Sequence, residues 1–160
     1  MSLQDLWRLS YDSHTIDILR NSKYAIPVIQ SFHLFGITLL LGSMVILNLR
    51  LSGIGLRQLP MAPLAKQIWR LALGGLLLAM ASGFLVFLPD PARYAANYAF
   101  RTKMVALCVA VGFQFLIYRK VIRSGAAAES GSPRNIMVAC CSLTSWFLVG
   151  WAGRAIAFLG

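Results

Sequence analysis

The sequence has little charge, and very little of it is negative. Lys, Arg, Asp and Glu make up 12% of the 160 residues, and only 5 residues are acidic. Soluble domains normally carry about 25% charged residues. Apolar residues make up 58% of the chain, which is more than the single small core of a domain of this length can bury. A water-soluble domain is therefore disfavoured, and the same composition excludes intrinsic disorder.

Cysteine is scarce, and the motifs of hydrolytic catalysis are missing. The 3 cysteines all lie in apolar runs, which excludes a disulfide-stapled secreted module. Adjacent helical residues such as Cys140 and Cys141 point about 100° apart and cannot chelate copper well, so we expect buried, unreactive thiols. There is no nucleophile elbow, phosphate-binding loop or zinc-binding spacing. We expect no hydrolase or transferase activity, but a cofactor-using membrane oxidoreductase stays open.

Long apolar runs are what the sequence does contain. A helix needs roughly 20 residues to cross the hydrocarbon core of a membrane. Short connections between such helices favour an up-and-down bundle. The sequence therefore predicts an all-α integral membrane protein, one domain over residues 1–160, with four transmembrane helices at about residues 24–49, 68–89, 101–119 and 135–158.

The N-terminal segment before the first run is polar with scattered apolar residues. This pattern predicts an amphipathic helix, or a helical hairpin, lying in the membrane interface over about residues 2–22. No cleavable signal-peptide pattern is present, so we expect the first span to remain in the mature protein.

The net charge of +10 comes from basic residues at the ends of the apolar runs. Basic residues at these positions lie at the level of the lipid headgroups. We therefore expect them to interact with the lipid bilayer and not with nucleic acid. The first-to-second and third-to-fourth loops are slightly richer in basic residues than the opposite side. This distribution predicts a multi-pass protein of the bacterial inner (plasma) membrane with both termini outside.

His33 lies in the middle of the first span, where an ionisable side chain is costly. One interpretation is a neutral histidine that forms an interhelical hydrogen bond near Gly36. The functional interpretations are ligation of a metal or heme by an imidazole nitrogen, or proton relay. We carry His33 forward as the first candidate ligand.

Four further residues complete the candidate site. Met80, in the second span, has about the same depth as His33 and is a candidate second metal ligand. Arg101 and Lys103 begin the third span and Arg154 lies near the end of the fourth, which gives a cationic rim on the outer side. Such a rim suits the two propionates of a heme b held below it.

Short motifs in these segments resemble known membrane-protein families. The chain resembles a group of small uncharacterised bacterial four-helix membrane proteins in Ser31-Phe-His33-Leu-Phe-Gly36, Arg93-Tyr-Ala-Ala-Asn-Tyr-Ala-Phe-Arg-Thr-Lys103 and Gly153-Arg154-Ala-Ile-Ala-Phe158. It is also distantly similar to HemJ-type membrane proteins, and CopD-type proteins share the helical pattern. The HemJ resemblance implies heme b, with His33 and Lys103 as the matching essential residues. Because Ile117-Tyr118 replaces that family's Tyr-His pair, it implies heme binding rather than protoporphyrinogen oxidation.

The sequence therefore predicts an inner-membrane protein that binds heme b or a related redox cofactor near the outer leaflet. A noncatalytic subunit or scaffold, which forms a homo-oligomer or binds a membrane or periplasmic protein, is a second hypothesis. Its basis is the series of small residues at Gly75, Ala79 and Gly83, which favours close helix packing. Transport of copper or protons through the bundle is a third.

Overall fold

A computed structural model describes residues 21–56, 58–123 and 131–159, and this part of the chain is helical without a strand. The prediction of an all-α fold with four long apolar helices is confirmed. The helices are α3 (Ala25–Ser52), α4 (Met61–Phe87), the short α5 (Pro91–Ala96), α6 (Tyr98–Arg123) and α7 (Pro133–Leu159). The interfacial helix predicted for residues 2–22 falls almost wholly outside the described residues.

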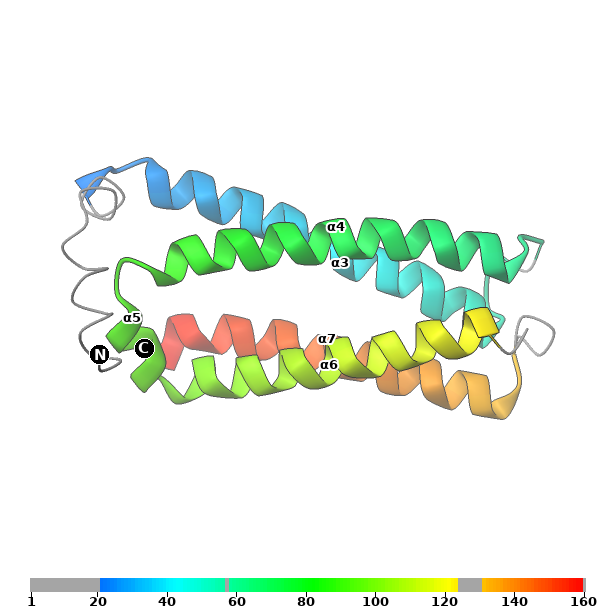
Figure 1. The fold of residues 1–160 in the computed structure, drawn as a ribbon. Coiled ribbons are helices and arrows are strands. Elements are labelled where there is room, and N and C mark those ends of the chain that lie inside the picture. The colour runs from blue at the N-terminus through cyan, green and yellow to red at the C-terminus, as the bar shows by residue number, and fades with distance from the viewer. Residues whose placement is uncertain (1–20, 57, 124–130, 160) are drawn as a thin grey trace.

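The four long helices run alternately up and down (Figure 1). α3 packs along α4, α6 packs along α7, and the two pairs contact each other mainly through α3 and α7. α5 joins α4 to α6 at one end of the bundle, which we call the α5 end. The α3–α4 and α6–α7 connections lie at the other end, which we call the turn end.

Local sequence signals explain where the helices begin and end. Gly53 ends α3 in the left-handed conformation, with a φ of 73° that suits glycine, and its N–H donates to the Arg50 carbonyl. Asp90 caps α5 by accepting from the Arg93 N–H, and proline follows in the first helical position. The Asn97 side-chain oxygen then accepts from the N–H groups of Ala99 and Phe100 at the start of α6.

The helices differ from the sequence expectations mainly at their ends. α4 begins at Met61, several residues before the expected span, because helical structure continues through Lys66 and Arg70 toward the turn end. α6 begins at Tyr98, so its membrane-spanning part, Tyr98–Ile117, includes Arg101 and Lys103. The charged start of the third span therefore enters the membrane-spanning helix.

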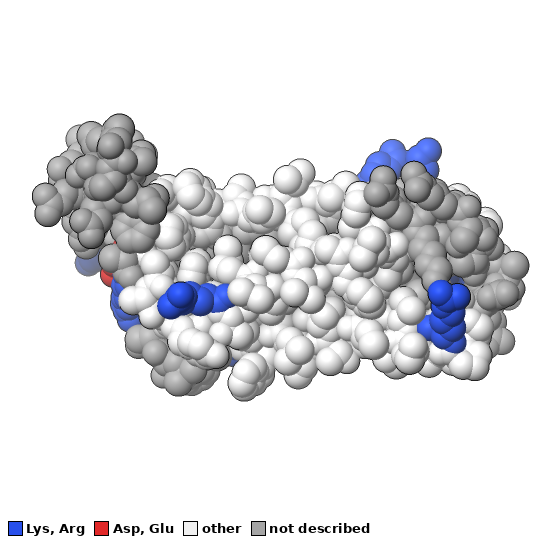
Figure 2. All heavy atoms as spheres, turned by 60° about the horizontal axis from the view of Figure 1, so that its bottom comes forward, with Lys and Arg blue, Asp and Glu red and all other residues white. Residues whose placement is uncertain are grey.

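The outer surface of the bundle is apolar. Each long helix has a stretch long and apolar enough to cross a membrane, and large side chains such as Phe35, Phe84 and Phe147 are exposed. Lys and Arg lie toward the two ends in Figure 2, with an uncharged band between them. The chain thus has the surface of a multi-pass membrane protein. The expectation that Cys140 and Cys141 are buried is wrong, since both thiols lie on this outer surface.

The apolar core occupies the middle and the turn end of the bundle. Near the turn end, buried side chains from α3, α4 and α6 pack together: Leu47, Leu51, Met61, Ala65, Ile68 and Ile117. In the middle, Trp146 and Val149 of α7 pack against a second group: Leu40, Met44, Ala72 and Ala110. Neither group extends to the α5 end, where His33 and Lys103 are only half-buried. The two clusters of buried apolar side chains therefore lie away from the candidate site.

α3 and α4 approach most closely where two glycines face each other. A Cβ added to Gly75 would lie 2.7 Å from the Leu40 nitrogen and 2.8 Å from the Gly36 oxygen. A Cβ added to Gly36 would lie 2.8 Å from the Ala79 nitrogen. The obstructing atoms are backbone atoms that cannot move aside alone. The close approach of helices that the small-residue series indicated is present, and only glycine permits it.

We predict that Gly75→Ala lowers the free energy of unfolding by about 1–3 kcal/mol, because the two backbones must separate to admit the methyl group. The adjacent Gly74 has no atom within 4 Å of an added Cβ. Gly74→Ala should therefore leave stability unchanged or raise it by up to about 1 kcal/mol. Denaturant unfolding of both variants in detergent checks the difference, and equal stabilities would contradict the close approach.

Candidate functional site

His33 lies on α3 about 12 Å of helical rise from its start at the α5 end. Its Nδ1 atom lies 2.8 Å from the carbonyl oxygen of Ala79 and 3.1 Å from the hydroxyl oxygen of Ser82, both on α4. A carbonyl oxygen can only accept, so Nδ1 carries the proton in this bond. The Ser82 hydroxyl donates to the Leu78 carbonyl at 2.5 Å, which leaves its lone pairs for the histidine. His33 thus forms the interhelical hydrogen bond that one interpretation of the sequence expected.

The rest of the imidazole ring rests on Gly83. A Cβ at this position would come within 3.0 Å of the His33 Cε1 atom and 3.4 Å of Nδ1. In the described part of the chain no hydrogen bond joins Nε2 to another residue. In the neutral ring Nε2 therefore keeps its lone pair, which can accept a proton or bind a metal.

Lys103 reaches the same region from α6. Its side chain passes over Gly153 of α7, where an added Cβ would lie 3.5 Å from Cε and 3.7 Å from Nζ. Among the described residues no carboxylate pairs with this ammonium group. Among the described residues, the α5 end thus holds an imidazole from α3 and an ammonium group without a carboxylate partner from α6.

The other predicted site residues lie more peripherally. Arg101 and Arg154 are at the same end of the bundle, but both are exposed on the outer surface. Met80 is 57% exposed, and α4 contacts His33 through Ala79, Ser82 and Gly83 instead. Of the predicted site residues, His33 and Lys103 are therefore half-buried at the α5 end, whereas the two arginines and the methionine are exposed.

Within the described residues no three His, Cys, Asp or Glu side chains lie close enough to hold a metal ion together. A bare metal ion needs about three or four protein ligands. A metal held in a macrocycle needs only one or two axial ligands from the protein. The arrangement around His33 matches the second case better than the first.

Sequence reasoning missed the groups that position the imidazole. The Ala79 bond comes from a backbone carbonyl, for which no side-chain pattern exists, and Ser82 has no unusual sequence context. A usable signal was the small-residue series that includes Gly83, because small residues mark the face of α4 that another helix approaches. The series was interpreted as packing alone, yet its last member also makes room for the ring.

A second polar group lies deeper in the bundle. The Asn48 amide nitrogen donates to the Met44 carbonyl at 2.8 Å and to the Ser142 hydroxyl at 3.0 Å. Ser142 in turn donates to the Gln114 side-chain oxygen at 2.8 Å. This chain, which we call the Asn48–Ser142–Gln114 cluster, links α3, α7 and α6, and all three side chains are buried. Its spacing in the sequence gave no sign that the three residues meet.

The fold is that of a multi-pass, four-helix membrane protein with a half-buried histidine on α3 and a half-buried lysine on α6 at the same end of the bundle. The chain belongs to a family of unknown function, DUF6644, whose model matches residues 17–159. No curated protein and no solved structure matches the chain. The comparisons therefore lend no support to the HemJ-type and CopD-type resemblances.

We predict that the neutral ring of His33 carries its proton on Nδ1, because that atom donates to the Ala79 carbonyl. Nitrogen-15 NMR of the histidine-labelled protein in detergent distinguishes the two tautomers by their ring-nitrogen shifts. His14→Gln removes the other histidine and assigns the signal. Gly83→Ala should disturb the tautomer, since its methyl group would meet the ring at 3.0 Å. A proton found on Nε2 in the unsubstituted protein would contradict the bond to Ala79.

Proposed function

We propose that this protein binds heme b, or a related metal-centred redox cofactor, at the α5 end of the bundle. The observation that carries the proposal is the bond from His33 Nδ1 to the Ala79 carbonyl, 2.8 Å long, which leaves Nε2 as the ligand atom. Histidines that bind metals almost always donate their other ring N–H to a carbonyl or carboxylate, which fixes the tautomer and orients the ring. His33 already has this arrangement.

The donor set also fits a heme better than a bare ion. A porphyrin supplies four ligands to iron, so a single protein imidazole can complete an axial position. His33 comes from a rigid helix, and its ring is held by α4 on one side through Ala79, Ser82 and Gly83. Met80 fits a second axial position poorly, because it is exposed on the outer surface of α4. We therefore propose His33 as the ligand that the protein supplies.

Lys103 is the proposed partner of a propionate. Its side chain is half-buried at the α5 end, packs against Gly153 and lacks a carboxylate partner in the described residues. An anion at this position would form a charge-assisted hydrogen bond with the ammonium group. Arg154 and Arg101, exposed at the same end, would contribute weaker attraction to the second propionate.

The orientation expected from the basic loops puts the α5 end, and with it the cofactor, near the outer leaflet of the inner membrane. Heme iron bound in this way supplies one-electron redox chemistry. The protein would contribute three things. α4 would orient the His33 imidazole, Lys103 would bind a propionate of the heme, and the surrounding helices would keep the cofactor within the apolar bundle.

We predict that the purified protein, titrated with heme in detergent, gives a Soret band that His33→Asn abolishes. Asparagine can still donate to the Ala79 carbonyl from a similar position, but it has no imidazole nitrogen for iron. The fold should therefore survive while the ligand is lost. The Soret band and the thermal unfolding of the same samples check both halves of this prediction.

Lys103→Gln should weaken heme binding about 10- to 100-fold, the usual size of a lost hydrogen bond to a charged group. Lys66→Gln is the matched control, because Lys66 is exposed on α4 near the turn end. It should leave the affinity unchanged. No Soret band in the unsubstituted protein, or a band that His33→Asn leaves intact, would refute the proposal. His33 would then act only as an interhelical contact, as the scaffold hypothesis expects.

A further inference from the structure

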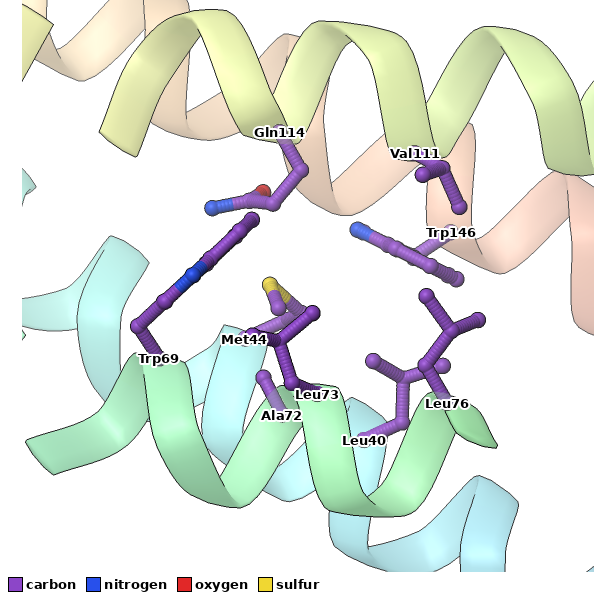
Figure 3. Close-up of a pocket in the computed structure, with 9 residues that line it drawn as sticks. All are labelled: Leu40, Met44, Trp69, Ala72, Leu73, Leu76, Val111, Gln114 and Trp146. Atoms are coloured by element: carbon purple, nitrogen blue, oxygen red, sulfur yellow. The ribbon is translucent and has the colours of Figure 1, made fainter. Parts of the chain in front are cut away.

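A half-open groove, which we call the α4–α6 groove, lies between the two helix pairs in the middle of the bundle (Figure 3). Its floor consists of buried side chains from all four long helices: Leu40, Met44, Ala72, Gln114 and Trp146. Its sides are partly exposed and belong to α4 and α6 alone: Trp69, Leu73, Leu76 and Val111. α4 and α6 are also packed less closely against each other than the other neighbouring long helices are. The groove therefore opens outward between α4 and α6.

The α4–α6 groove lies within the apolar part of the bundle. Between Trp69 and Leu76 it extends for about 10 Å along α4, and most of this length belongs to the charge-free run that follows Arg70. Its surface is almost entirely apolar, because the nitrogen atoms of Gln114 and Trp146 are buried beneath it. An empty groove would forfeit van der Waals contacts. A hydrocarbon chain from the surrounding bilayer therefore fits this surface.

Arg70 places a cation beside the groove on the side of the turn end. It directly follows Trp69 and precedes Leu73 by three positions, so it is a neighbour of the open side on the surface of α4. The Arg70 side chain is exposed. Side chains of a helix tilt toward its N-terminus, which for α4 lies at the turn end. This tilt directs the guanidinium group away from the charge-free run and toward the level of the lipid headgroups.

The turn end is rich in positive charge. Its cations include residues of three helices: Lys66 and Arg70 of α4, Arg119, Lys120 and Arg123 of α6, and Arg134 of α7. Asp90, which is the one acidic residue in the described ranges, caps α5 at the opposite end. The orientation expected from the loops makes the turn end cytoplasmic. Basic pockets between transmembrane helices on that side bind the headgroups of anionic lipids.

We propose that the α4–α6 groove binds one acyl chain of an anionic phospholipid whose phosphate pairs with Arg70. A guanidinium group binds a phosphate through two parallel hydrogen bonds, which gives the site its preference for the headgroup. The rings of Trp69 and Phe115, with centres 6.1 Å apart, border the groove on its turn-end side and join α4 to α6. The site is separate from His33 and Lys103 at the α5 end, and it requires no cofactor.

Native mass spectrometry of the unsubstituted protein tests the headgroup preference without relying on a variant. The protein is titrated in detergent with phosphatidylglycerol and, separately, with phosphatidylcholine that carries the same acyl chains. The first phosphatidylglycerol should bind about 10-fold more tightly than the first phosphatidylcholine, because several cations surround its headgroup.

Arg70→Gln should reduce this preference about fivefold, as expected for the loss of one cation at a membrane surface. Arg134→Gln is the matched control. It removes the same charge at the same end of the bundle, but Arg134 is exposed on α7, which forms part of the floor of the groove and none of its sides. The preference should persist in this control.

Leu73→Trp tests the acyl chain, because the larger ring fills the groove from its open side and should remove the bound lipid. Leu77, one turn further along α4, is 65% exposed and does not line the groove. Leu77→Trp therefore adds the same ring outside the groove and should leave binding intact. Thermal unfolding of both variants in detergent shows that each is folded.

Three results would overturn the lipid site. Equal affinities for the two lipids would remove the headgroup preference. Equal effects of Arg70→Gln and Arg134→Gln would mean that the charge of the turn end acts without a defined site. Unchanged binding in Leu73→Trp would place the lipid outside the groove. All of these measurements are made without heme, so failure here and failure of the proposed function are distinguishable.

Discussion

The contact between α3 and α4 at Gly36 and Gly75 is the constraint on which the site depends. Because glycine has no Cβ atom, the backbones of α3 and α4 come close together at Gly36 and Gly75. A side chain on α3 can then reach a carbonyl on α4. His33 lies one turn from Gly36 toward the α5 end, and Ala79 lies one turn from Gly75 in the same direction. The imidazole therefore meets the Ala79 carbonyl because of where the helices cross. In lipid such interhelical polar contacts are retained, since the alternative is an unpaired group in hydrocarbon.

The uneven packing of the bundle follows from the same geometry. The two apolar clusters fill the middle and the turn end, whereas the α5 end contains small residues and two half-buried polar side chains. A cluster of aromatic rings closes this end instead, with Phe87 stacked on Phe100 at 5.5 Å between ring centres and Tyr94 beside both. The apolar core and the candidate site thus occupy different parts of the bundle axis. Substitutions near His33 therefore leave both apolar clusters in place.

Much of the fold could be predicted from the sequence because hydrocarbon imposes so strong a constraint. Four charge-poor runs indicate four helices, and short connections indicate an up-and-down order. Helix ends were less accessible, since Lys66 and Arg70 interrupt the apolar run but do not interrupt the helix. The short helix α5 was missed, although an aspartate followed by a proline at Asp90 and Pro91 is a recognisable helix start.

The candidate site was predictable only in part. His33 stood out because it is the one histidine in a span, and Lys103 because it begins the shortest apolar run. Which residues each side chain contacts depends on how its helix is rotated about its own axis. The sequence of a weakly amphipathic helix does not indicate this rotation. On α4, apolar side chains occupy both buried positions such as Ile68 and exposed positions such as Leu77. Hydropathy therefore could not indicate that Met80 faces outward.

The buried polar groups share an imbalance between donors and acceptors. Three nitrogen groups carry protons without a described acceptor or counter-ion: the Lys103 ammonium, the Gln114 amide and the Trp146 indole. Two side-chain acceptors of the described residues also lack a donor, His33 Nε2 and the Asn48 oxygen. A membrane interior with surplus donors favours electron-rich guests, because each such guest relieves a desolvation cost that the protein otherwise bears alone. An anionic group beside Lys103, such as a heme propionate, would satisfy this requirement.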